Sequence, residues 1–325
     1  MKNENQILLQ TKELKKYFSG KKGLFNLHPP VVKAVDDINL TIHKGETLGL
    51  VGESGCGKST LGRTILNLIP KTSGQILYEG QDIGDYSKKQ MWEMRRKMQI
   101  IFQDPYSSLN PRMTVYDLVS APLEVYGIGS HEERREMVIS ILQDVGLDKQ
   151  YLNRFPHEFS GGQRQRIGIA RALILNPEFV VCDEAVSALD VSVRAQVLNL
   201  MKKMQAKRNL TYLFISHDLS VVRHVSDRVA VMYLGSVVEV AEKKELYGHP
   251  IHPYTKALLS AIPIPDANRK RHRIILEGDV PSAYNPPSGC KFHTRCPYAT
   301  ERCSQEIPKL RDVGSGHLVA CHLEG

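Results

Sequence analysis

Residues 52–60, which read Gly-Glu-Ser-Gly-Cys-Gly-Lys-Ser-Thr, have the types and spacing of a phosphate-binding loop. Glycines let the backbone turn so that successive N–H groups converge on phosphate oxygens. In this pattern Lys58 reaches the β- and γ-phosphates, and the Ser59 hydroxyl ligates Mg²⁺. A glycine-rich turn that binds nothing is the plain alternative. The predicted nucleotide contacts in the loop are Gly52, Ser54, Gly55, Cys56, Gly57, Lys58, Ser59 and Thr60.

Two carboxylates end an apolar run farther along the chain. The run Phe179-Val180-Val181-Cys182 is followed directly by Asp183 and Glu184, which predicts a buried strand with two acids at its end. Asp183 suits a Mg²⁺ partner, and Glu184 suits the general base that activates water for attack on a γ-phosphate. A solvated acid pair at a strand end is the alternative, but the phosphate loop in the same chain favours function.

A second anion site is predicted at the start of a helix over residues 161–175. Ser160 stands at the N-cap position, and Gly161 and Gly162 leave the first amides of the helix accessible. Gln163 follows them. Ser-Gly-Gly alone is weak support, because a capped helix start can be purely structural.

Four of the six cysteines, Cys290, Cys296, Cys303 and Cys321, fall in the last 36 residues. In a reducing cytosol this clustering indicates a metal rather than disulfides. The spacings match neither zinc ribbons nor bacterial ferredoxins, yet four thiolates suffice for a [4Fe–4S] cluster or a Zn²⁺ site. Both remain open on the residues alone.

The elements that must position these residues alternate between strands and helices. Strand patterns and helix patterns predict a largely parallel sheet, with ligands at the carboxyl ends of its strands. Between residues 104 and 176 the strand signal disappears, which predicts an inserted helical subdomain. Predicted strands lie at 31–35, 38–42, 48–51, 75–78, 100–102, 179–184, 211–215 and 229–234. Predicted helices lie at 88–97, 115–126, 132–145, 161–175, 191–208, 219–225 and 253–262, besides one after Thr60.

Composition excludes several classes. Hydrophobic residues make up 42% and charged residues 24%, as in an ordinary folded core. No apolar run approaches the roughly 18 to 20 residues that span a bilayer, and no signal peptide is predicted at the start. The formal charge of +8 and the early lysines are read as a solvated face, because no aromatic and base-reading pattern accompanies them. No nucleic-acid partner is expected.

Together, and in this order, these motifs resemble the nucleotide-binding subunit of an ATP-binding cassette (ABC) transporter, over about residues 6–262. The marks are the phosphate loop 52–60, Gln103, the signature 160–163, the strand 180–183 with Glu184, the loop 187–190 and His217. The resemblance implies an ABC-type P-loop ATPase core with an antiparallel β-subdomain and an inserted helical subdomain. Phe159 replaces the usual Leu and Ala185 the usual Pro, but neither change removes a polar group that the chemistry needs.

The resemblance also implies roles for single residues. Tyr17 would stack on adenine, with Phe18 as the alternative. Gln103 would contact Mg²⁺ or the attacking water, and His217 would contact the γ-phosphate, although an isolated histidine there would be read as a helix cap. In this family two chains sandwich ATP head to tail, so that Ser160, Gly161, Gly162, Gln163 and Asp190 would serve the nucleotide of the sandwich.

The C-terminal part resembles the extension of oligopeptide and dipeptide importer ATPases, through segments 252–259, 281–290 and 296–297. We therefore predict a nucleotide-binding domain over 1–262 and a cysteine-containing extension over 263–325. The resemblance implies a [4Fe–4S] cluster ahead of zinc at the four cysteines. It also implies a second, non-identical ATPase subunit, two membrane permease subunits, an extracellular solute-binding protein, and a location on the cytoplasmic face of the membrane. Alternatives are import of nickel or another solute, and a soluble ATPase complex such as one for phosphonate degradation.

Overall fold

The computed structural model describes residues 6–20, 31–262 and 274–323. These divide into two compact units. The first holds His43–Glu46 and Tyr86–Ile215, and the second holds the described parts of Ile7–Ile42, Thr47–Asp85 and Ser216–Gly325. The beginning of the predicted C-terminal extension, residues 263–273, lies outside the described residues.

The first unit is built on three parallel strands, β6 (Met98–Ile101), β7 (Phe179–Asp183) and β8 (Thr211–Ile215). Strand β7 lies between the other two, with Val181 opposite Ile100 on one side and Leu213 on the other. Every residue of β7 and β8 is buried. Parallel strands covered on both faces read as continuous apolar runs, which is why the sequence predicted them well.

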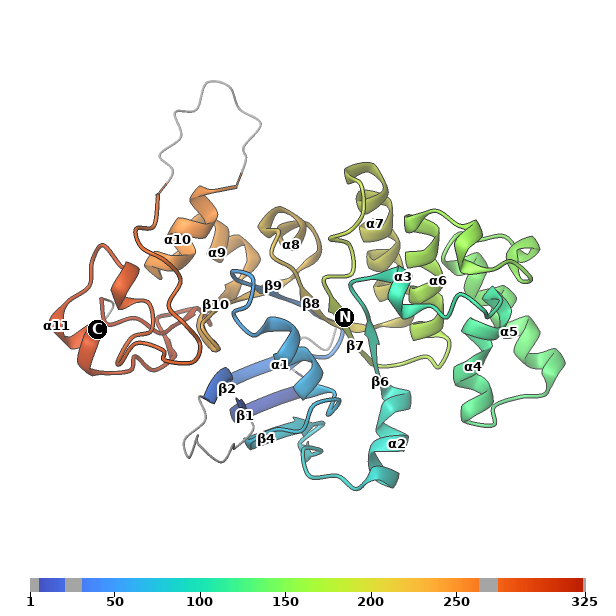
Figure 1. Ribbon diagram of the computed structural model, residues 1–325, viewed down its shortest axis with the longest axis horizontal. Coiled ribbons are helices and arrows are strands. Elements are labelled where there is room, and N and C mark those ends of the chain that lie inside the picture. The colour runs from blue at the N-terminus through green and yellow to red at the C-terminus, as the bar shows by residue number, and fades with distance from the viewer. Residues whose placement is uncertain (1–5, 21–30, 263–273, 324–325) are drawn as a thin grey trace. The chain divides into compact units, whose positions relative to one another are not determined.

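The other regular elements described in the first unit are helices, as the sequence predicted for residues 104–176. The green helices α4, α5 and α6 in Figure 1 pack against one another, and α7 packs against α6. Serine or threonine caps begin α4, α5 and α6, each in a reciprocal capping box. The helices are α2 (Lys88–Lys97), α3 (Pro105–Ser108), α4 (Val115–Val125), α5 (His131–Asp144), α6 (Gly161–Leu173) and α7 (Val191–Arg208).

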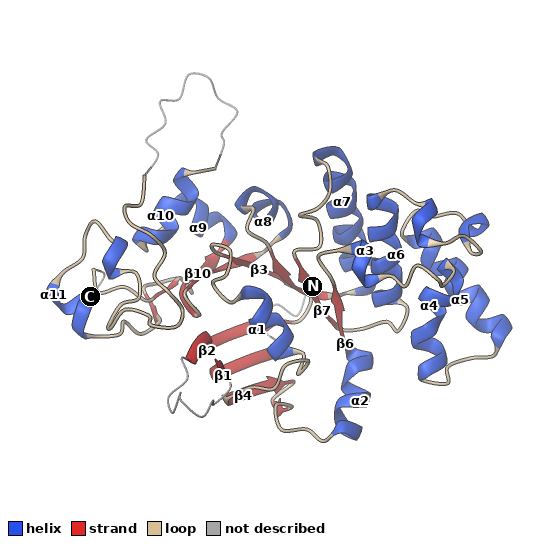
Figure 2. Cartoon of the chain, viewed as in Figure 1, coloured by secondary structure: helices blue, strands red, loops and turns tan. Residues whose placement is uncertain are grey.

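The second unit contains a four-stranded sheet in the order β2-β1-β4-β5, against which helix α1 (Lys58–Ile65) packs (Figure 2). The strands are β1 (Ile7–Ser19), β2 (Val31–His43), β4 (Ser73–Tyr78) and β5 (Gln81–Asp82). The two strands predicted at 31–35 and 38–42 are one continuous strand. Asp37 takes a left-handed φ of 60° within it, so a local irregularity interrupts the alternation without ending the strand.

A second sheet of this unit joins β3 (Thr47–Val51) in parallel to β9 (Arg228–Tyr233). Strand β10 (Ser236–Glu242) pairs antiparallel with β9, and the short β12 (Leu318–Val319) pairs antiparallel with β10. Residues 318–319, close to the C-terminus, therefore belong to this sheet, which the sequence did not predict. The remaining elements are α8 (Leu219–Val225), α9 (Lys243–Gly248), α10 (Pro253–Ser260), α11 (Glu301–Gln305) and β11 (Arg311–Asp312).

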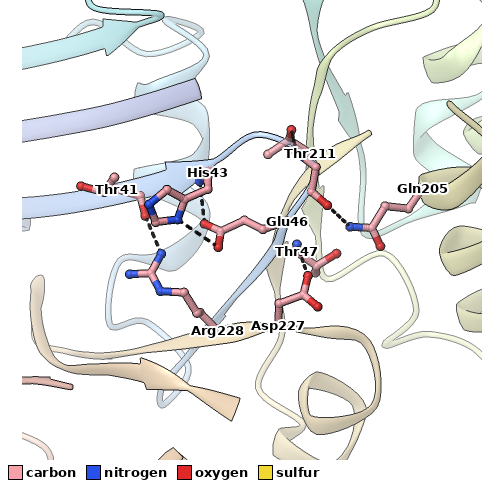
Figure 3. A network of polar contacts seen from close by, with 9 residues as sticks. Thr41, His43, Glu46, Thr47, Gln205, Thr211, Asp227 and Arg228 are labelled. Carbon is pink, nitrogen blue, oxygen red and sulfur yellow. Dashed lines mark hydrogen bonds and ion pairs between the residues drawn. The ribbon is translucent and has the colours of Figure 1, made fainter. Parts of the chain in front are cut away.

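Polar contacts fix the turn before β3 and the start of that strand (Figure 3). In the first unit, the His43 backbone N–H donates to Glu46 Oε1 at 2.7 Å and Gln205 donates to the Gly45 carbonyl. In the second unit, Asp227 accepts from the Thr47 backbone N–H at 2.8 Å. No helix within the described ranges has the length and apolarity needed to cross a membrane.

Candidate nucleotide site

The predicted phosphate loop connects β3 to helix α1 (Lys58–Ile65), as expected. Gly57 precedes the helix with a left-handed φ of 104°, and Gly52 has a φ of 154°. A Cβ at Gly57 would lie 1.9 Å from the Ala34 carbonyl oxygen, and one at Gly52 would lie 2.1 Å from that of Met232. Both positions therefore require glycine, because the backbone of neighbouring strands runs directly against the loop.

Lys58 is buried inside this loop. Its ammonium donates to the carbonyl oxygens of Gly52 and Glu53, at 2.8 Å each, so the loop closes around the cation. Burial raises the pKa of the neighbouring Cys56 thiol, and the Lys58 charge opposes that shift. Cys56 is therefore a neutral packing residue, and Lys58 is the charge that the loop offers to an anion.

The predicted catalytic carboxylate and the predicted Gln103 are in contact in the first unit. Gln103 Nε2 donates to Glu184 Oε2 at 3.1 Å, although 81 residues separate them. Glu184 follows β7 in a left-handed conformation with φ 48°, and its carbonyl accepts from the Ser187 hydroxyl at 2.9 Å. Asp183, the last residue of β7, is only 2% exposed. The structure thus gathers three predicted functional positions at the carboxyl end of β6 and β7.

The predicted second anion site begins helix α6. Ser160 accepts from the Gln163 N–H, and Gln163 Oε1 accepts from the Ser160 N–H at 3.0 Å. Ser160 is exposed and Gly162 is buried. A Cβ at Gly162 would lie 2.3 Å from Val193, so this glycine permits close packing against α7. Asp190, at the N-cap of α7, is exposed.

Tyr17 and His217 lie in the second unit with Lys58. The half-buried Tyr17 lies near the end of strand β1 and donates its hydroxyl to Asp36. Burial and this hydrogen bond raise the pKa of Tyr17. Phe18 is 40% exposed. His217 is exposed, and the cap of helix α8 is the adjacent Asp218, which accepts from the Ser220 N–H at 2.9 Å. His217 therefore does not serve as that cap.

The predicted Mg²⁺ donors are the Ser59 hydroxyl, the Gln103 amide and the Asp183 carboxylate. Oxygen donors of these kinds are the ligands that Mg²⁺ takes in phosphate sites. The residues therefore fit the ion by their chemistry. Ser59 belongs to the second unit, and Gln103 and Asp183 belong to the first.

The four C-terminal cysteines all lie within the described residues, and none of them is in a disulfide bond. Burial, followed by weaker repulsion from Cys303, Cys321 and Cys296, raises the pKa of Cys290 to about 11. The Cys290 backbone N–H donates to the Cys303 carbonyl at 2.7 Å, so these two cysteines are neighbours. However, within the described ranges no group of three or more His, Cys, Asp or Glu side chains is arranged to hold a metal ion, so the predicted [4Fe–4S] cluster and the zinc alternative have no support here.

Sequence reasoning missed the residues that hold the phosphate loop from outside. Glu53, within the loop, contacts Arg295 and Tyr254, and Asp36 contacts Lys291. Sequence separations of 201 to 255 residues carry no local signal for these pairs. In the sequence, the only indication of these contacts is that Lys291 and Arg295 lie among the clustered cysteines.

Comparison with known proteins gives two family matches. Residues 35–187 match the family described as ABC transporter, and residues 238–303 match the C-terminal region of oligopeptide/dipeptide transporters. The oligopeptide transport ATP-binding protein AppF of Bacillus subtilis is 54% identical over 321 residues, covering 98% of each chain. The probable peptide ABC transporter ATP-binding protein y4tS of Sinorhizobium fredii is 51% identical, covering 98% of this chain and 90% of that protein.

A solved structure is similar as well. The ATP-binding cassette MJ0796, as a dimer in a post-hydrolysis state bound to ADP and phosphate, aligns with a TM-score of 0.64 and 30% identity. The alignment covers 73% of this chain and 99% of that one. The fold predicted from the motifs is thereby confirmed as that of an ABC cassette.

Proposed function

Because this chain belongs to the ATP-binding subunit family of oligopeptide and dipeptide ABC transporters, we propose that it hydrolyses ATP to energise peptide import. ATP would bind at the loop 52–60, with Lys58 neutralising the phosphates and the Ser59 hydroxyl as a Mg²⁺ ligand. Gln103 and Asp183 are the candidate Mg²⁺ ligands of the first unit. Bound Mg²⁺ supplies charge neutralisation at the phosphates. The peptide specificity rests on relatives named as oligopeptide and peptide transporters and on the matching C-terminal region.

The hydrogen bond between Gln103 and Glu184 is the observation that carries the catalytic proposal. Phosphoryl transfer to water needs a group that orients the water and takes its proton. Glu184 has this chemistry, and the 3.1 Å bond from Gln103 orients its carboxylate. Through this bond, Gln103 would couple the orientation of the Glu184 carboxylate to the position of the segment that follows β6.

We expect Glu184→Gln to lower the rate of ATP hydrolysis by two orders of magnitude or more. Glutamine keeps the size of the side chain and the contact with Gln103, but it cannot accept a proton at neutral pH. ATP binding should remain, because Lys58 is unchanged. Phosphate release and ATP affinity, measured on the assembled transporter, separate the two effects.

Glu178→Gln is the matched control for this variant. Glu178 immediately precedes β7 and pairs with Lys44 and Lys97 at 3.6 Å, so it is a structural carboxylate in the same unit. Its substitution should leave the hydrolysis rate unchanged. If Glu184→Gln hydrolysed ATP at the parent rate, its assignment as general base would be wrong.

The assembly that we propose contains two related ATPase chains and two membrane permease subunits, served by an extracellular solute-binding protein. The chain would lie on the cytoplasmic face of the membrane. The exposed Ser160 at the start of α6 would contact the nucleotide of the facing chain. The exposed Asp190 at the N-cap of α7 would serve the same nucleotide. Support comes from the dimeric form of the similar MJ0796 cassette.

For the organisation of the chain, we propose a nucleotide-binding domain over 1–262 and a C-terminal extension over 263–325. The metal content of that extension is a separate question from ATP hydrolysis. Anaerobic purification followed by iron, sulfide and zinc analysis answers it. Stoichiometric iron and sulfide would support the cluster, zinc would support the alternative, and metal-free protein would contradict both.

A further inference from the structure

The second residue of the phosphate loop, Glu53, is held by three separate groups. Its carboxylate pairs with Arg295, whose Nη1 lies 3.1 Å from Oε2 and 3.3 Å from Oε1. Its backbone N–H donates to the Tyr254 hydroxyl at 2.9 Å, and its carbonyl accepts from Lys58 at 2.8 Å. Side chain, N–H and carbonyl each have a partner, so the conformation of this residue is fixed on all sides.

The two outer partners are themselves well anchored. Arg295 ends the short 3₁₀ helix His293–Arg295, and only 8% of its side chain is exposed. Tyr254, in α10, is fully buried, with its ring centroid 4.7 Å from that of Tyr233 and 5.4 Å from that of Phe292. An ion pair with such a buried cation is screened less by solvent than a surface pair is. Both partners therefore hold Glu53 from rigid positions.

The same C-terminal segment reaches Tyr17, the residue predicted to contact adenine. Lys291 donates to Asp36 Oδ2 at 2.8 Å, to the Leu234 carbonyl at 2.9 Å and to the Ser236 hydroxyl at 2.7 Å. Asp36 in turn accepts from the Tyr17 hydroxyl. One short segment, residues 291–295, thus supports both the loop for the phosphates and the residue for the base.

We propose that segment 291–295, together with Tyr254, is a positioning element for the nucleotide. It holds the phosphate loop and Tyr17 in place, and Arg295 neutralises a carboxylate that stands within the loop for an anionic ligand. Arg295, Tyr254 and Lys291 are positioning residues and do not touch the reacting atoms. The proposal rests on the proposed function, since it assumes that ATP binds at loop 52–60.

The charge of Glu53 gives the proposal a measurable consequence. Without Arg295, its carboxylate would repel the phosphates of the nucleotide. We expect Arg295→Gln to weaken the binding of fluorescent methylanthraniloyl-ATP to the full chain, measured in the presence of Mg²⁺, by roughly fivefold. This loss of affinity should be larger at low salt than at high salt. In the assembled transporter the KM for ATP should rise by a similar factor, with kcat nearly unchanged.

A second substitution separates positioning from general damage to the fold. Glu53→Gln removes the charge that Arg295 neutralises, so adding Arg295→Gln to it should change affinity by less than about twofold. Damage to the fold would persist in the double variant. Tyr254→Phe removes only the hydroxyl that accepts from Glu53, and it should weaken binding in both backgrounds alike, because it acts on the backbone.

Matched controls come from the same region. Arg302 pairs with Glu306 at 2.8 Å, and both side chains are 58% exposed. Arg302→Gln therefore breaks an exposed ion pair that does not involve Glu53. Tyr298→Phe removes an exposed hydroxyl. Both variants should bind the ATP analogue as the parent does.

The outcomes distinguish this inference from the proposed function. If the parent chain did not bind the ATP analogue, or if Lys58→Ala bound it equally well, the proposed function itself would fail. If the parent bound it and Arg295→Gln and Tyr254→Phe both behaved like their controls, the positioning role alone would be overturned. An equal loss from Arg295→Gln in the parent and in the Glu53→Gln background would also overturn the charge argument.

Discussion

His252 is a buried histidine that caps helix α10 through its side chain. Its Nδ1 accepts from the Tyr254 backbone N–H at 3.1 Å, so this nitrogen carries no proton. Burial, with a smaller contribution from Lys256, lowers the pKa of His252 to about 3. The Glu239 carboxylate accepts from the His252 backbone N–H at 3.1 Å. A neutral imidazole is therefore part of the structure that holds Tyr254 beside the phosphate loop.

This histidine predicts loss of stability in acid. Unfolded histidine has a pKa of about 6.5, so below that pH the unfolded chain takes up a proton that the folded chain does not. Stability should fall as the pH drops from about 6.5 towards about 3. His252→Asn keeps an N-cap acceptor but does not titrate. Between pH 7 and 5.5 the free energy of unfolding should fall by about 1 kcal/mol more in the parent than in the variant.

Chemical denaturation at several pH values measures this difference. Parallel pH profiles for parent and variant would contradict the assignment of a neutral, buried His252. The comparison with the variant removes the contribution of the carboxylates, which titrate in both proteins.

Ser160, at the N-cap of helix α6, has two roles, one in capping the helix and one in the proposed contact with nucleotide. Ser160 caps the helix by accepting from the Gln163 N–H, and it is also the exposed group proposed to meet the nucleotide of a facing chain. Capping needs only an acceptor oxygen, whereas an anion site needs a small neutral side chain. The two roles can therefore be separated by substitution.

We expect Ser160→Ala to lower the free energy of unfolding by about 1 kcal/mol, because the cap is lost. Ser160→Asp should keep the cap and the stability, since aspartate is an equally good N-cap. Its charge should nevertheless lower ATP hydrolysis in the assembled transporter, because it would face phosphate. Thermal unfolding and hydrolysis rates together check both statements.

Ser130→Asp in helix α5 is the control for this experiment. Ser130 forms the same kind of capping box with Glu133, so the substitution places the same charge at a cap that has no proposed ligand. Hydrolysis should be unaffected. Normal hydrolysis by Ser160→Asp would contradict an anion site at the start of α6.

We propose that the whole molecule acts as one of two ATPase chains that associate with the membrane permease subunits. We expect this chain, purified from detergent-solubilised membranes, to bring with it a second, related ATPase chain and two permease subunits. Glu184→Gln with ATP should increase the recovered ATPase pair, because a slow site keeps the nucleotide bound. Gel filtration and identification of the recovered subunits measure both.

Recovery in a soluble complex alone would favour a non-transport ATPase. The Glu178→Gln variant, treated identically, should give no increase in the pair. The permease subunits that are recovered would identify the transported solute.

The local chemistry of this protein was determined by its sequence. The loop 52–60 and the cap at Ser160 depend on residues within a few positions of one another, and glycine and serine have conformational preferences that act locally. The buried strands β7 and β8 could also be predicted from the sequence, because continuous apolar runs of that length are typical of strands buried on both faces. These features placed Lys58 at the start of α1 and Glu184 directly after β7.

The support around these residues was decided only by the tertiary structure. Gln103 meets Glu184 across 81 residues, and Arg295 meets Glu53 across 242. Strand β12 joins β10 through a pairing of two residues, and β2 continues through Asp37 where the alternation breaks. No local preference specifies such contacts, because each depends on where the folded backbone carries a distant residue. The sequence therefore indicated which groups are candidates for the chemistry, and the fold decided which distant residues contact them.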